Sequence, residues 1–237
     1  MMLDELTVLL DEVPGSASRS DYAEAIISGN CLRKPTGATR KLTNQRLGEL
    51  YGLDTAITIF RVLRQFWNAD QPGRPIIALL AALARDPLLR ATADPVIRMQ
   101  PGEELSRQQL TNAVSDAVAS RLNAEILDKV VRNAASSWTQ SGHLTGRSRK
   151  TRQRVRPTPL STAYALMLGY LLGLRGQRLF ESPWCRVFDA STDEVIFTAM
   201  DAKRSGYIDL KHAGSVIEVG FAGLLTSEER QLSHGTH

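Results

Sequence analysis

A helix pattern that runs directly into a basic segment constrains this chain more than any other feature. After Asn123, apolar residues recur at three- and four-residue steps, which predicts an amphipathic helix. They are Ile126, Leu127, Val130, Val131, Ala134, Ala135 and Trp138. Asn123 suits the N-cap, and Gly142 suits the position just past a helix end. The sequence therefore predicts a helix from Asn123 to Ser141.

The opposite face of this helix carries side chains that can bind nucleic acid. They are Lys129, Arg132, Asn133, Ser136 and Gln140. Lys and Arg match phosphates and guanine, and Asn and Gln match adenine, so this face is suited to the major groove of DNA. The alternative is an ordinary surface helix, because a mixed polar face is typical of a solvated helix.

The segment that follows is strongly basic. Between residues 147 and 156 there are six cationic residues and no acidic one. These are Arg147, Arg149, Lys150, Arg152, Arg154 and Arg156. The alternation of Arg152, Arg154 and Arg156 is typical of an extended strand. We expect a hairpin, or wing, that binds phosphates beside the helix; the alternative is a disordered basic linker.

The charge distribution favours a polyanionic partner. From Lys129 to Phe180 the chain has ten Lys and Arg residues and no Asp or Glu. The whole chain has 29 basic and 25 acidic residues, so the remainder has 19 basic and 25 acidic and carries −6. A window of +10 within a chain of net charge +4 indicates a polarised molecule.

A second basic cluster lies near the N-terminus. It contains Arg33, Lys34, Arg40, Lys41 and Arg46. Thr36 is expected to begin a helix that reaches Tyr51, with Leu42, Leu47 and Leu50 facing inward. Free amides at a helix start beside basic side chains can bind phosphate. The alternative is a solvated basic face.

The remaining signals predict a mainly α fold. We expect a helical bundle with winged helix-turn-helix character and a small C-terminal β-hairpin, divided into an N-terminal helical domain (1–101) and a winged-helix-like domain (102–237). The segment after Pro101 supplies the first helix of the helix-turn-helix pair. The predicted N-caps are Ser20, Thr36, Asp54, Ser106 and Asn123. The most apolar window, residues 163–174, is too short to span a bilayer, and residues 161–174 predict a buried helix.

The C-terminal region predicts the hairpin. Apolar residues alternate on either side of a glycine-containing turn. They are Ile208, Leu210, Ile217, Val219 and Phe221. The polar tail beyond Thr226 is expected to fray.

Enzymatic function is not indicated. The chain lacks a glycine-rich phosphate loop, and its histidines and two cysteines do not occur at metal-ligand spacings, so neither a metal nor a cofactor is predicted. His143 has no recognisable orienting partner, so we expect a structural or phosphate-neighbouring role. Without a signal peptide, a cytoplasmic protein with reduced thiols is expected.

Three segments resemble the BrxA family of small subunits from bacteriophage-exclusion (BREX) defence systems. They are NCLRKPTGATRKLTNQRLGELY, RPIIALLAALARDPLLRATADPVI and LNAEILDKVVRNAASSWTQSGHL. The resemblance spans roughly residues 22–225 and concerns pattern and spacing. It implies a mostly helical protein with winged-helix character that binds double-stranded DNA beside other defence-system subunits. It implies no catalytic residues.

We therefore expect a non-enzymatic DNA-binding subunit with weak sequence preference, because only Asn133 and Gln140 are suited to reading adenine. An RNA-binding helical module and a protein adaptor are the alternatives. Because the wing is predicted to be exposed, replacing Arg152, Arg154 and Arg156 with alanine is expected to change stability little.

Overall fold

The computed structural model describes residues 1–119, 121–214 and 216–232. This part of the chain is mainly helical with two small antiparallel hairpins, in agreement with the predicted mainly α class. The N-terminal helices are α1 (Leu3–Glu12), α2 (Arg19–Ile27), α3 (Gly37–Tyr51), α4 (Thr58–Trp67), α5 (Arg74–Arg85), α6 (Pro87–Ala91) and α7 (Ala93–Ile97). The next elements are α8 (Arg107–Ala117), α9 (Ala124–Gln140), β1 (Leu144–Thr145) and β2 (Thr151–Arg152). They are followed by α10 (Pro159–Leu171), α11 (Gln177–Phe180), the short 3-10 helix Cys185–Val187, α12 (Thr192–Arg204), β3 (Asp209–Ala213), β4 (Val216–Gly220) and α13 (Ser227–Leu232).

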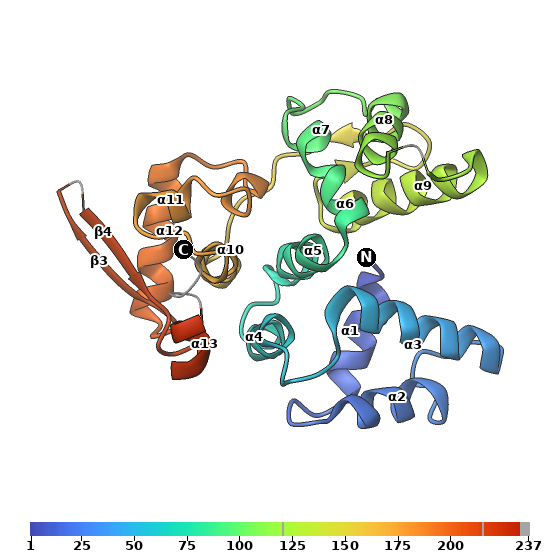
Figure 1. Cartoon of the computed structure of the whole chain (residues 1–237), viewed down its shortest axis with the longest axis horizontal. Coiled ribbons are helices and arrows are strands. Elements are labelled where there is room, and N and C mark those ends of the chain that lie inside the picture. Colours follow the sequence, from blue (N-terminus) through green and yellow to red (C-terminus); the bar gives the residue numbers. More distant parts are fainter. Residues whose placement is uncertain (120, 215, 233–237) are drawn as a thin grey trace.

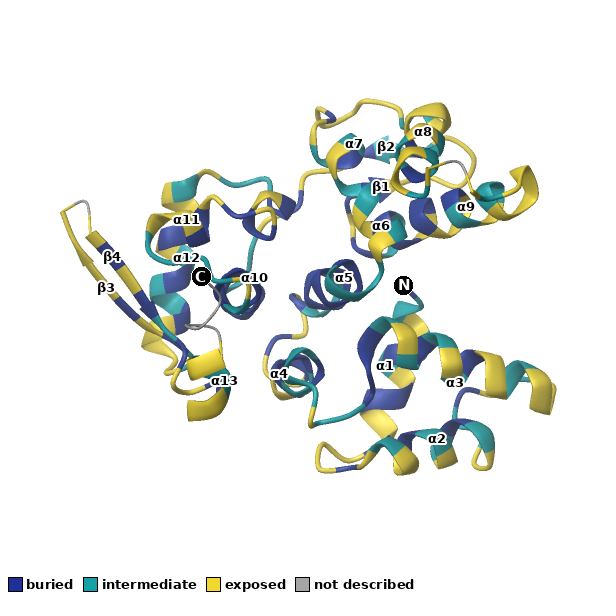
Figure 2. Cartoon of the chain, in the orientation of Figure 1, coloured by how far each residue is buried: buried dark blue, intermediate teal, exposed yellow. Residues whose placement is uncertain are grey.

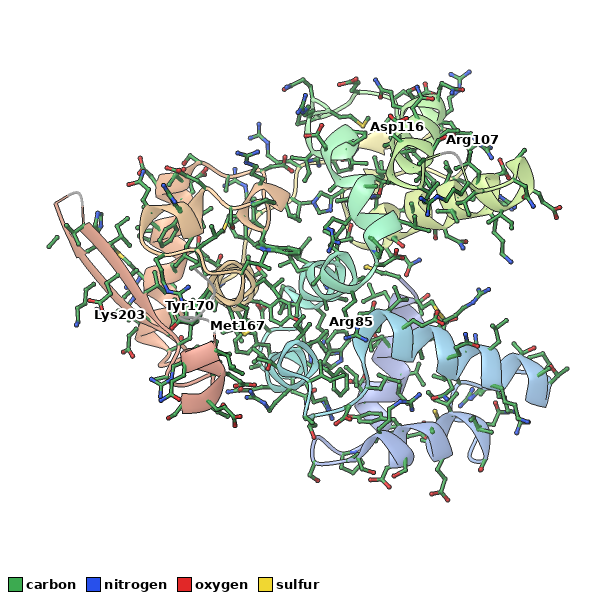
Figure 3. The ribbon with its side chains drawn as sticks, viewed as in Figure 1. Arg85, Arg107, Asp116, Met167, Tyr170 and Lys203 are labelled. Atoms are coloured by element: carbon green, nitrogen blue, oxygen red, sulfur yellow. The ribbon has the colours of Figure 1, made fainter. Side chains whose placement is uncertain are left out.

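Two apolar helices form the centre of the molecule. Helix α10 is buried on every side from Leu160 to Tyr170, and α5 is buried from Ile76 to Leu83. They pack against each other and against α4, with Met167 of α10 fully buried (Figure 1, Figure 3). A helix that is apolar all round is stable in water only when other elements cover it. The predicted buried helix is therefore confirmed, although it ends at Leu171 and not at residue 174 as predicted.

Local capping explains where several helices begin. Thr36, Ser106 and Asn123 each accept a hydrogen bond from the backbone N–H three residues later, as predicted. The predictions for Ser20 and Asp54 are wrong. Ser18 caps α2, and the Asp54 carboxylate binds the Ala56 N–H in the turn before α4 begins.

The predicted boundary at residue 101 falls within a packed unit. Helices α6 and α7, before that residue, pack against α8 and α9, after it, and α10 packs against α4 and α5. Buried apolar residues from all of these helices belong to one core. Figure 2 shows the buried positions turned toward the neighbouring elements and the exposed ones on the outer faces.

The C-terminal hairpin has the predicted faces. In the antiparallel register Leu210 lies opposite Val219 and His212 opposite Ile217. Ile208, Leu210, Ile217, Val219 and Phe221 are all buried. The inward-facing set is therefore confirmed.

The segment beyond Thr226 is helical as far as Leu232, so the prediction that it frays is wrong there; residues 233–237 lie outside the described part. The Glu229 carboxylate accepts bonds from both Arg61 Nη2 and Thr58 Oγ1 on α4. Desolvation opposes the charged form, but these donors lower the pKa of Glu229 to about 2. The ion pair between Glu229 and Arg61 therefore holds α13 against α4. None of the helices in the described ranges is long and apolar enough to cross a membrane.

Candidate nucleic-acid interface

The predicted helix and hairpin belong to one small packed unit, residues 87–152. A short extended segment, residues 103–105, pairs with β2 on the side away from β1. Leu105 N donates to the Lys150 carbonyl (2.7 Å), and Arg152 N donates to the Glu103 carbonyl (2.9 Å). The unit therefore runs in the order two short helices (α6 and α7), short extended segment, helix (α8), helix (α9) and hairpin. This extra pairing was not predicted, because three residues are too few for a strand pattern.

Helix α9 is fixed by its ends and by its apolar stripe. The Asn123 side chain accepts from Ile126 N at 2.8 Å, and Gly142 ends the helix with φ +87°. Trp138 is fully buried and donates from Nε1 to Thr92 Oγ1 at 2.8 Å. The buried part of the stripe and this bond hold α9 against α6 and the turn between α6 and α7. The predicted helix is therefore confirmed, although Ile126 of the predicted stripe is exposed.

Two of the polar side chains predicted to bind DNA on α9 are free. Lys129 and Asn133 are exposed, and among the described residues no partner binds either side chain. Arg132 is also exposed, but its Nε lies 3.0 Å from the carboxylate of Asp128, which also binds Arg107 of α8 (Figure 3). The sequence could have indicated this pair, because an acidic residue four positions before a basic one on a helix can form an ion pair with it. Asp128 therefore weakens the basic character of this face.

The C-terminal half of α9 is not free to read bases. Gln140 Oε1 accepts from Leu3 N (2.7 Å), and its Nε2 donates to Ser136 Oγ (3.1 Å). A base contact by Gln140 would break the bond to Leu3. The prediction that Gln140 is an available adenine reader is therefore wrong for this conformation, and Ser136 is engaged with it.

Glycine sets the tip of the hairpin. Gly146 has φ +103°, and a Cβ there would lie 2.0 Å from the Arg149 carbonyl oxygen, so only glycine fits this turn. Arg147 and Arg149 extend from the tip and are exposed. The nearest carboxylate to Arg149 is that of Glu104, at 4.0 Å, and the Arg149 side chain is 84% exposed. An ion pair so exposed leaves the guanidinium available to a phosphate.

Two of the predicted wing cations serve the fold instead. Lys150 Nζ donates to Thr139 Oγ1 (2.8 Å) and thereby joins the hairpin to α9. Arg152 is 1% exposed: Nε donates to the Val96 carbonyl (3.0 Å) and Nη2 to Asp189 Oδ1 (2.7 Å). A buried guanidinium with these partners cannot reach phosphate. The prediction that Arg152 binds DNA is wrong, because residues distant in sequence enclose its side chain.

Arg154 and Arg156 lie on the chain between β2 and α10, not in a strand. Strand β2 ends at Arg152, so the predicted strand over residues 152–156 is wrong. Both side chains are exposed, and Arg156 Nη1 lies 3.9 Å from the Glu194 carboxylate. Arg154 remains an accessible cation, although it lies outside the hairpin.

His143 is a buried structural residue. Its two ring nitrogens bind Ser141 Oγ and the Val187 carbonyl, each at 2.8 Å. Burial lowers the pKa of His143 to about 4, and the nearby Arg152 acts in the same direction. A neutral, enclosed imidazole is consistent with the predicted structural role, but not with contact to phosphate.

The N-terminal cluster is only partly available. Lys34 Nζ pairs with the Glu5 carboxylate (2.9 Å), and Arg40 donates to the carbonyls of Lys34 and Ile27. Arg33 and Lys41 are exposed.

The start of α3 is partly capped by its own side chain, because Thr39 N donates to Thr36 Oγ1. Leu47 is fully buried and Leu50 packs against the core, but Leu42 is 45% exposed, so its predicted inward position is wrong. Lys34 and Arg40 therefore hold the chain around α3, which leaves Arg33, Lys41 and the half-buried Arg46 as accessible cations.

Comparison of the chain with family models, with curated proteins and with solved structures finds no match.

Proposed function

We propose that this protein is a non-enzymatic subunit that binds double-stranded DNA, and that it acts in a BREX-type phage-defence complex with other subunits. The observation that carries the proposal is the unit formed by residues 87–152. Its order of two short helices, extended segment, two longer helices and hairpin resembles that of a winged helix, which supports the proposal. In such a unit the second helix of the pair enters a groove and the hairpin binds the backbone.

The accessible cations give the proposed interface its chemistry. Arg147 and Arg149 at the hairpin tip and Lys129 on α9 are exposed and suited to phosphate. Asn133 is the one amide of the predicted set that is free to contact adenine. Because most of these contacts carry no sequence information, the proposal retains weak sequence preference.

Tethering reduces the number of phosphate contacts expected from the six wing cations. Lys150 and Arg152 are held inside the protein, and Arg156 faces Glu194. We therefore expect two to four contacts from Arg147, Arg149, Arg154 and Lys129 together. The logarithm of the association constant should fall with the logarithm of salt concentration at about −0.9 per contact.

The decisive experiment is a fluorescence-anisotropy titration of a random-sequence duplex at several salt concentrations. The variant Arg147→Ser with Arg149→Ser should bind all duplexes more weakly, with a salt slope shallower by about one to two units. A charge-matched control is Arg178→Ser with Arg186→Ser, because both side chains are exposed on another part of the molecule. The control should keep the slope of the unmodified protein.

Other outcomes identify the alternatives. Stronger competition by duplex or single-stranded RNA than by DNA would favour an RNA-binding module. Absence of binding to any nucleic acid at low salt would favour a protein adaptor. Equal slopes for the two double variants would refute the role of the hairpin tip.

A further inference from the structure

A groove of about 670 Å³ separates α3 from α9. Its walls are α9 on one side and α1 and α3 on the other, and its floor is the junction of α5 and α6. Figure 1 shows α3 and α9 extending from the centre of the molecule toward the same side. This volume falls within the range of about 300–1,000 Å³ that is typical of ligand sites. We call it the α3–α9 groove.

The groove is long rather than compact. Its α9 wall contains Ile126, Val130, Asn133, Ser137 and Gln140, which recur every three or four residues along one face. At 1.5 Å per residue, this face is about 21 Å long. The bond between Leu3 N and Gln140 lies at one end of it. That length suits a peptide segment better than a compact small molecule.

Apolar side chains remain accessible inside the groove. Ile126 is 47% exposed, and Leu50, Leu88 and Val130 are only partly covered by the rest of the core. They come from α3, α6 and α9, so the apolar surface continues across both walls and the floor. A phosphate backbone offers no apolar group to cover them, whereas a peptide with aliphatic or aromatic side chains does.

The carboxylates that line the groove already have partners. Glu5 accepts from Lys34 (2.9 Å), and Glu49 accepts from Gln45 (2.8 Å). Asp86 accepts from the first backbone N–H groups of α6 as its N-cap. Only Glu5 is neutralised by a cation, whereas Glu49 and Asp86 are bound by neutral donors and keep their negative charge. Three lining cations, Arg46, Arg85 and Lys129, stand against these two carboxylates, so the groove carries a small positive excess.

Unlike these carboxylates, some of the cations that line the groove have no partner among the described residues. Arg85 donates to the carbonyls of Glu49 and Gly48 at the end of α3 (Figure 3). For Arg46 on one wall and Lys129 on the other, the described residues supply no hydrogen-bond or ion-pair partner. Two unpaired cations beside an apolar surface match a ligand that combines carboxylates with apolar side chains.

We infer that the α3–α9 groove binds an acidic segment of a partner protein, whose apolar side chains contact Leu50, Leu88 and Ile126 and whose carboxylates pair with Arg46 and Lys129. A segment of about 14 residues in a helix, or about six in an extended form, spans the α9 wall.

The test is selection of 12-residue peptides from a random display library on the full chain, followed by anisotropy titration of the enriched peptides. We expect enrichment of Asp and Glu together with Leu, Ile or Phe. The variant Arg46→Glu with Lys129→Glu should bind these peptides at least about tenfold more weakly, because charge reversal places like charges together. Arg178→Glu with Arg186→Glu, outside the groove, should bind them normally. Enrichment of no sequence, or of peptides that bind both double variants equally, overturns the inference.

A second variant keeps the test valid if the charge reversal prevents folding. Ile126→Gln changes an exposed side chain and removes an apolar contact in the groove. It should weaken the same peptides and leave the melting temperature nearly unchanged. Unaltered peptide affinity in this variant would also contradict the inference.

One consequence rests on the proposed function. Lys129 and Asn133 line the groove and also belong to the proposed DNA interface, so a bound peptide should weaken duplex binding. Peptide binding by a chain that binds no DNA would leave this inference intact and refute the proposed function. DNA binding by a chain on which no peptide is selected would refute this inference and leave the proposed function intact.

Discussion

Because Arg152 is buried, replacing it with alanine is expected to destabilise the protein strongly, in contrast to the small change expected from the sequence. The guanidinium is 1% exposed and donates to the Val96 carbonyl and to Asp189, so it joins α7, β2 and the segment before α12. Alanine would leave the Val96 carbonyl without this donor and the Asp189 carboxylate without its cation. The site would also contain a cavity.

The magnitude follows from these losses. Removing one partner of a buried ion pair costs roughly 3–5 kcal/mol, because the remaining charge stays uncompensated. Asp189 is 21% exposed and also accepts from Val155 N, which places the expected cost at the lower end, about 3 kcal/mol. For a chain of 150–250 residues, 1 kcal/mol corresponds to about 2–4 °C, so the melting temperature should fall by about 6–12 °C.

Urea unfolding followed by circular dichroism measures this change. Arg154→Ala is the matched control, because Arg154 is exposed two residues away, and it should change the free energy of unfolding by less than about 0.5 kcal/mol. Asp189→Asn, alone and combined with Arg152→Ala, completes a double-mutant cycle whose coupling should exceed about 1 kcal/mol. A loss below about 1 kcal/mol for Arg152→Ala, or no coupling, would refute a structural role for this arginine.

Two further predictions concern pH and the C-terminal helix. The pKa of His143 is lowered from 6.5 to about 4 in the folded state, because burial favours the neutral imidazole. The contribution of His143 to the free energy of unfolding is therefore complete above pH 6.5 and is lost as pH falls through 4. Between pH 7 and 4 the free energy of unfolding should fall by about 3 kcal/mol because of His143. Urea titrations at both pH values should show a smaller fall in His143→Asn than in the unmodified protein. An equal fall in the two proteins would contradict the lowered pKa of His143. Glu229→Gln should free α13, because it removes the charged partner of Arg61. Hydrogen exchange should then rise over residues 226–232 with little change elsewhere, and unchanged protection would show that the pair does not hold the helix. Because the pKa of Glu229 is lowered to about 2, its contribution to stability is present above about pH 4.5 and is lost as pH falls through 2.

Local patterns in the sequence determined α9 and the C-terminal hairpin, but not the strands of the basic hairpin. The apolar steps of α9 and its Asn123 cap are properties of neighbouring residues, so they predicted that helix correctly. The alternation of Ile217, Val219 and Phe221 likewise predicted their buried face. In each case the interaction that fixes the element spans only a few residues.

The tertiary structure decided which polar side chains remain accessible. Arg152 and Arg154 belong to the same basic run, yet only the first is buried, because its partners Val96 and Asp189 lie 56 and 37 residues away. Gln140 is occupied by the backbone of Leu3, 137 residues away. Charge and periodicity specify which groups are able to bind phosphate or bases. Their availability depends on long-range packing, since a donor satisfied inside the protein must lose that bond before it can bind another molecule.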